Sequence, residues 1–85
     1  MIVQLQILED VVVTRLGPFL GESMARAALE GHCRSLGFES AMLTQEQVEV
    51  LLRRLRQGMI LFVGADKADQ LIESVRDDLN SRAPS

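Results

Sequence analysis

The segment 44–63 constrains the fold more than any other part of the chain. Its apolar residues recur at spacings of four, three, four and three, which on an α-helix form one continuous stripe. The residues of this stripe are Val48, Leu52, Leu55, Met59 and Phe62, and the flanking Leu51 and Val63 widen it. A helix with so broad an apolar face is not stable alone in water, so we expect the other segments to cover it.

Local signals define the start of this helix. Thr44 is followed three residues later by Gln47, a capping-box pattern that predicts a helix beginning near Gln45. Gly58 interrupts the helix, and we expect it to mark a bend or a close approach of another backbone.

A last helix is predicted over residues 66–81, after Gly64 ends the central one. Asp66 is expected to cap it, because a side-chain carboxylate there accepts from free backbone N–H groups. Its core face has the same helical spacing and consists of Ala68, Leu71, Ile72, Val75 and Leu79.

The first segment carries two patterns. Leu8, Val12 and Leu16 share one helical face with Leu5, which favours a helix over residues 3–16. The alternation of apolar residues with Gln4 and Gln6 leaves a starting strand over residues 2–7 as the alternative.

The dipeptide Gly17-Pro18 is predicted to separate this helix from a second one over residues 18–36. Glycine favours the left-handed conformation after a helix, and proline is tolerated in the first turn of the next. A kink inside one longer helix is the alternative. Gly37 is expected to end the second helix, and the connector 38–43 to pack against the core.

Two faces are expected on the second helix. Charged residues recur every four positions and predict an exposed stripe: Glu22, Arg26, Glu30 and Arg34. The face expected to pack against a neighbour consists of Leu20, Met24, Ala27, Ala28 and Gly31.

The predicted fold is therefore all-α, a compact four-helix bundle or orthogonal array with a short N-terminal strand as an option. The 85 residues are expected to form one domain, 1–85, in which 82–85 is a frayed tail. A single cysteine, Cys33, forms no intrachain disulfide and suits a reducing compartment. There is no secretory signal pattern and no apolar run long enough for a membrane span, so a cytoplasmic location is expected.

Composition and spacing also argue against several functions. The net charge of -3 and the aromatic fraction of 4% disfavour nucleic-acid binding. His32 and Cys33 are neighbours that diverge on a helix, and no second ligand pair accompanies them, so no metal site is expected. No carboxylate pair or nucleophile–base arrangement is apparent. We therefore expect neither an enzyme nor a cofactor.

One basic cluster stands out, formed by Arg53, Arg54 and Arg56. We expect a solvated face or a docking patch for an acidic partner, which includes the acidic stripe of the last helix on another copy. The alternative is a small nucleic-acid-associated regulator.

The strongest functional hint is the apolar run 59–63, which covers more than one helical face. Because three other helices in so small a domain cannot bury all of it, we expect part of it to contact a partner or a second copy. The predicted homodimer interface comprises Ile2, Leu5, Val12, Met59, Ile60, Phe62 and Val63. A sensor with an apolar small molecule in its core is a further alternative.

The segment 13–28, VTRLGPFLGESMARAA, carries a family resemblance. It resembles a small helical domain of unassigned role attached to bacterial signalling proteins, including serine/threonine kinases. Leu16-Gly17-Pro18 matches the family's Leu/Ile-Gly-Pro, and the later helices fit from about Leu5 to Leu79. The chain departs from the family in having Phe19-Leu20 after the proline. The resemblance implies a regulatory or interaction module in bacteria, with no catalytic residues to transfer.

Overall fold

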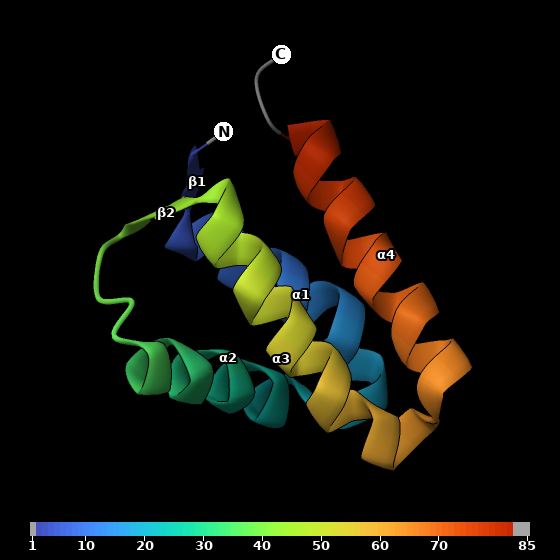
Figure 1. The fold of residues 1–85 in the computed structure, drawn as a ribbon. Coiled ribbons are helices and arrows are strands. Elements are labelled where there is room, and N and C mark those ends of the chain that lie inside the picture. The colour runs from blue at the N-terminus through green and yellow to red at the C-terminus, as the bar shows by residue number, and fades with distance from the viewer. Residues whose placement is uncertain (1, 83–85) are drawn as a thin grey trace.

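The computed structural model describes residues 2–82, which contain four helices and two short strands (Figure 1). In chain order these are β1 (Ile2–Gln4), α1 (Leu5–Leu20), α2 (Glu22–Leu36), β2 (Met42–Thr44), α3 (Gln45–Val63) and α4 (Ala65–Arg82). Helices α3 and α4 are neighbours joined by a tight turn, while α1 contacts both α2 and α4. The predicted all-α fold with a short N-terminal strand is confirmed. Of the tail 82–85, Arg82 belongs to α4, and residues 83–85 lie outside the described part.

The strand option for the first segment is correct only for its first three residues. Strand β1 pairs antiparallel with β2, with Val3 opposite Leu43 and Ile2 opposite Thr44. Val3 and Leu43 point into the core, at 7% and 0% exposure, while their neighbours along both strands are exposed. The Leu5 amide then donates to the Ala41 carbonyl, at 2.8 Å, where the chain turns into α1. The connector before α3 is thus tied to the core, as predicted.

The predicted helix break at Gly17-Pro18 is wrong. Helix α1 contains Pro18 and continues to Leu20, and the break falls at Gly21, whose φ of 89° suits glycine alone. Proline lacks the N–H for an intrahelical bond, and this loss falls in the last turn of α1, where the Gly21 amide bonds to the Gly17 carbonyl at 2.7 Å. Gly17 is buried where α2 begins, and an added Cβ would lie 3.2 Å from Glu22 Cγ. Gly17 therefore allows close approach rather than capping a helix.

The core-facing side of α2 also differs from the prediction. Its buried residues are Ala25, Leu29 and Cys33, whereas Met24 is 49% exposed and Ala27 is exposed. The predicted charged stripe is exposed on all four positions. Gly37 ends α2 in the left-handed conformation, as expected, with the Phe38 amide bonded to the Cys33 carbonyl at 2.9 Å.

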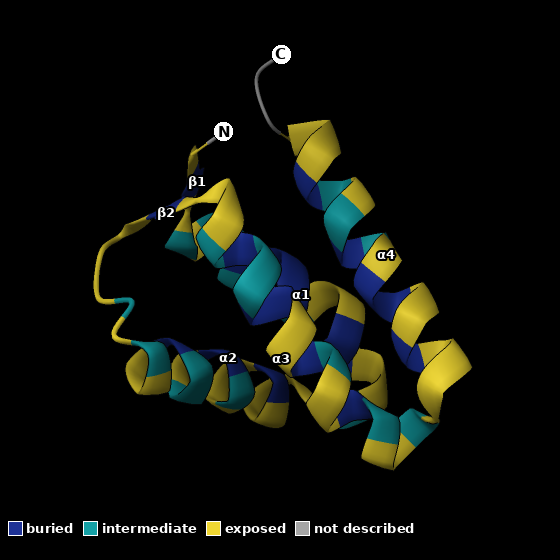
Figure 2. Ribbon diagram, in the orientation of Figure 1, coloured by how far each residue is buried: buried dark blue, intermediate teal, exposed yellow. Residues whose placement is uncertain are grey.

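The core is organised around α3 and α4, as their spacing predicted. Buried positions recur as dark segments along both helices, separated by half-buried and exposed ones (Figure 2). Four of the five residues of the α3 stripe are at most 2% exposed, and Leu51 is fully buried with them. All five predicted core residues of α4 are buried. Phe62 is the exception, at 64% exposure, although Ile60 and Val63 of the same turn pack against the core.

Helix termini agree with the sequence at both ends of α3, where Thr44 and Gly64 are the caps, and not at the start of α4. The capping box is present: the Gln47 amide donates to Thr44 Oγ1 at 3.2 Å, and the Thr44 amide to Gln47 Oε1 at 2.9 Å. Asp66 is not the N-cap of α4, since Gly64 precedes a helix that begins at Ala65. An added Cβ at Gly58 would meet nothing within 4 Å, so no backbone approaches there.

Ion pairs on the surface join helices that pack together. Arg26 of α2 binds Glu9 of α1 at 2.8 Å, and Arg15 of α1 binds Asp78 of α4 at 3.1 Å. Arg76 of α4 holds both carboxylate oxygens of Glu49 on α3, at 2.8 and 3.1 Å and also pairs with Glu73. Such partly exposed pairs contribute modestly to stability, typically below about 1 kcal/mol each.

Candidate functional site

Four large apolar side chains are exposed where helices end and begin. Phe19 lies in the last turn of α1 and Met24 near the start of α2, at 46% and 49% exposure. Leu61 and Phe62 lie in the last turn of α3, at 88% and 64%. We call these four residues the apolar end. In Figure 1 the junctions α1–α2 and α3–α4 both lie at the lower end of the molecule.

A side-chain contact connects these two junctions. The Lys67 ammonium, in the first turns of α4, lies 4.9 Å from the centre of the Phe19 ring. This is a cation–π distance, and it joins the end of α1 to the start of α4. The apolar end therefore has charge at its edge as well as exposed hydrocarbon.

Two residues of the predicted interface belong to the core instead. Val12 is fully buried and Met59 is 2% exposed, because both face inward and belong to the common hydrophobic core. They are not available to a partner. Ile60, Val63 and Leu5 are half-buried against the core.

The remaining predicted interface residues lie far apart. Ile2, 59% exposed, pairs with Thr44, the cap residue at the start of α3, whereas Phe62 lies in the last turn of that helix. The 19 residues of α3 span about 28 Å at 1.5 Å per residue. Ile2 and Phe62 therefore do not form one surface.

The interface predicted from the sequence does not include Leu61 or Phe19, although Leu61 belongs to the apolar run 59–63. Leu61 falls seven positions after Arg54 and so on the exposed face of α3, a signal that was available from the helical period. The sequence places Phe19 in the first turn of the second helix, which in the structure begins at Glu22. Phe19 instead belongs to the exposed end of α1, and this was not apparent from the sequence.

The basic cluster is divided by the fold. Arg56 pairs with Asp69 of α4 within the same chain, which raises the pKa of Arg56 and lowers the pKa of Asp69. Arg53 and Arg54 are exposed, and no carboxylate among residues 2–82 lies within ion-pair distance of either. Two arginines of the cluster thus remain accessible.

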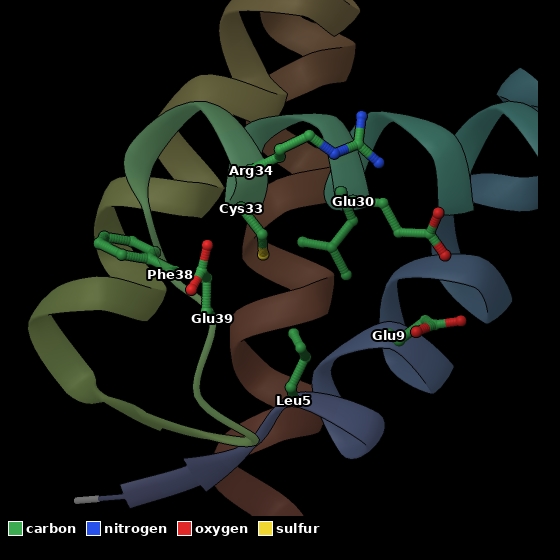
Figure 3. A pocket seen from close by; sticks show the side chains of 8 residues that line it. Leu5, Glu9, Glu30, Cys33, Arg34, Phe38 and Glu39 are labelled. Atoms are coloured by element: carbon green, nitrogen blue, oxygen red, sulfur yellow. The ribbon is translucent and has the colours of Figure 1, made fainter.

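A pocket of about 280 Å³ lies between α1, α2 and the segment that connects α2 to β2 (Figure 3). Its lining combines an apolar floor with a charged rim. The floor residues are Leu5, Leu29, Cys33 and Phe38, and the rim residues are Glu9, Glu30, Arg34 and Glu39. The sequence did not predict this pocket, because its walls are brought together only by packing.

His32 and Cys33 are neighbours on α2 with different environments, since Cys33 is buried and His32 is half-buried. Cys33 is 7% exposed, and burial, followed by the charges of Glu30 and Glu9, raises the pKa of its thiol. Burial and then the charge of Arg54 lower the pKa of His32. At neutral pH the thiol is therefore protonated and a weak ligand and nucleophile.

Residues 2–82 contain no group of three or more His, Cys, Asp or Glu side chains arranged to hold a metal ion. None of the helices within these residues is long and apolar enough to cross a bilayer.

Comparison with known proteins returned no relative: no protein-family model, curated protein or solved structure matches this chain. The resemblance to the helical domain of bacterial signalling proteins therefore rests on Leu16-Gly17-Pro18 and the helix pattern alone.

Proposed function

We propose that this chain is a protein-interaction module that self-associates through the apolar end, as an accessory part of bacterial cytoplasmic signalling or assembly. The family resemblance supports the bacterial and signalling context of this proposal. The single cysteine, which is free and buried, supports the cytoplasmic location.

The observation that carries this proposal is the exposure of Leu61 and Phe62. They are adjacent, and they are the two most exposed large apolar residues in the described chain, at 88% and 64%. Exposed hydrocarbon is unfavourable in water, and large apolar side chains are typical anchors of protein interfaces. Burial against a partner would remove this cost.

A second copy is the partner best suited to the charges around the apolar end. Glu22 and Asp66 lie at the starts of α2 and α4, and Lys67 lies beside Phe19. In a two-fold contact the same residues face each other in reversed order, so a surface with both signs can pair with itself. A strongly acidic or basic partner would instead favour a rim of one sign.

The test is absolute mass by light scattering over a dilution series, for the wild type and for Phe62→Asp. We expect a wild-type dimer at micromolar concentration, and a monomer for the variant, because an interface anchor contributes at least about 2 kcal/mol, or roughly thirtyfold in dissociation constant. Ile2→Asp is the matched control. Its side chain has similar exposure at the other end of α3, so this variant should stay dimeric.

Several outcomes would reject the proposal. A wild type that is monomeric up to submillimolar concentration, or a Phe62→Asp variant that stays dimeric, excludes self-association through this surface. Loss of the dimer in Ile2→Asp would indicate that the interface lies at strand β1 instead. Steeply salt-dependent binding to DNA that is lost in R53A/R54A would favour the nucleic-acid role instead.

A further inference from the structure

We propose that the pocket between α1 and α2 binds a small amphipathic organic cation. Its apolar part would occupy the floor, and its ammonium group would lie at the carboxylate rim. This proposal goes beyond self-association and does not depend on it, because the pocket lies near the start of α1 and the apolar end at the finish of that helix.

The floor of the pocket offers an apolar environment. Leu29 is 1% exposed, and Leu5 and Phe38 are half-buried against the same core. Cys33 completes the floor, and Figure 3 shows its sulfur directed toward the Leu5 side chain. Since burial raises the pKa of this thiol, it is protonated at neutral pH and acts as a small apolar group.

The rim has an excess of negative charge. It carries three carboxylates against one guanidinium, that of Arg34. Glu9 is already paired with Arg26, but no ion pair involves Glu30 or Glu39 within the described residues. In Figure 3 Glu39 lies on one side of Cys33 and Glu30 on the other, so a cation over the floor is attracted from both sides.

The volume of the pocket limits the size of the ligand. The cavity of about 280 Å³ lies at the small end of the roughly 300–1,000 Å³ typical of ligand sites. A primary amine with a short alkyl chain or one phenyl ring fits this limit, whereas a nucleotide does not. The half-open shape leaves the ammonium group in contact with water at the rim.

The first test is a titration with hexylammonium, followed by amide chemical shifts. We expect saturable shifts at Leu29, Cys33 and Phe38, and at least tenfold weaker binding of hexanol and hexanoate, which match the chain but lack the positive charge. The variant E30Q/E39Q should weaken hexylammonium binding by about tenfold, because each exposed charge pair is worth up to about a factor of five. The control E46Q/D77N changes the net charge equally, at exposed carboxylates outside the pocket, and should bind as the wild type does.

The second test uses the thiol of Cys33 as a reporter. Methyl methanethiosulfonate, a small neutral reagent, transfers its methylthio group to the thiol and releases methanesulfinic acid. Hexylammonium at ten times its dissociation constant should slow this reaction about tenfold in the wild type. At the same concentration the protection should fall to about twofold in E30Q/E39Q.

The proposal is overturned if hexylammonium gives neither saturable shifts at the pocket nor protection of Cys33. It is also overturned if hexanol or hexanoate binds as tightly, or if E30Q/E39Q retains the wild-type affinity. A wild-type amide spectrum for E30Q/E39Q outside the pocket shows that the variant is folded, so that its loss of affinity reports on the rim.

Discussion

Two leucines of α3 provide a direct test of the packing described above. Leu51 is fully buried at the centre of the helix, whereas Leu61 is 88% exposed in its last turn. Replacing either by alanine removes the same atoms. For Leu51 the lost transfer free energy is about 2.4 kcal/mol, at roughly 0.8 kcal/mol per buried carbon group. The unfilled cavity raises the expected loss in the free energy of unfolding to about 3–5 kcal/mol.

The same substitution at Leu61 should change the free energy of unfolding of the monomer by less than about 0.5 kcal/mol. The difference between the two variants is a large part of the total free energy of unfolding, because a chain of this length is typically stable by about 4–13 kcal/mol. The assay is urea denaturation followed by circular dichroism. We expect a lower midpoint with an unchanged slope for Leu51→Ala. The protein must be dilute enough to be monomeric, since association adds to the apparent stability.

Equal losses in the two variants would refute the assigned packing of α3. A loss above about 2 kcal/mol for Leu61→Ala in the monomer would mean that Leu61 is buried within the chain. A loss that appears only at high protein concentration would instead support burial of Leu61 between two copies.

Further predictions concern the backbone and the ion pairs. Gly21→Ala should lower the free energy of unfolding by about 1–3 kcal/mol in thermal melts, because an L-residue is strained at a φ of 89°. Gly58→Ala should raise it by about 0.5–1 kcal/mol, since the position is helical, exposed and open to a Cβ. Hydrogen bonds from Arg82 and Arg15 lower the pKa of Asp78. The stabilisation that the Asp78 carboxylate contributes to folding is therefore present above about pH 4. It is lost as the pH falls through the lowered pKa of Asp78. Urea midpoints should show a weaker acid dependence in Asp78→Asn.

The regular helices were predictable because their signals are local. The α3 stripe, its capping box at Thr44 and the core face of α4 are all present as expected. Each depends on residues within one or two turns of one another, so their meaning does not change with the rest of the fold.

The end of the first helix was predicted less well because two local signals competed, Gly17-Pro18 and Gly21. Gly17-Pro18 has the features of a helix boundary, yet α1 continues to Leu20 and breaks at Gly21. A Cβ at Gly17 would make a tight contact with Glu22 at the start of α2, and such a contact arises only between elements. The exposed face of α2 was correctly predicted, but its buried face consists of Ala25, Leu29 and Cys33 rather than the residues expected there.

The candidate sites depend on tertiary structure. Phe62 shares the apolar stripe of α3, and the helical period alone predicts its burial, yet it is 64% exposed while Ile60 and Val63 of the same turn pack against the core. Glu9, Glu30 and Glu39 gather around one pocket only after α1 and α2 pack.

The sequence by itself determined the helical class, the central stripe and the caps, because periodicity and capping act within a few residues. The tertiary structure decided which end of α3 stays exposed, which arginines remain unpaired in the described chain, and where a pocket opens. These features depend on which distant residues reach a given side chain, and that is set by how the helices pack.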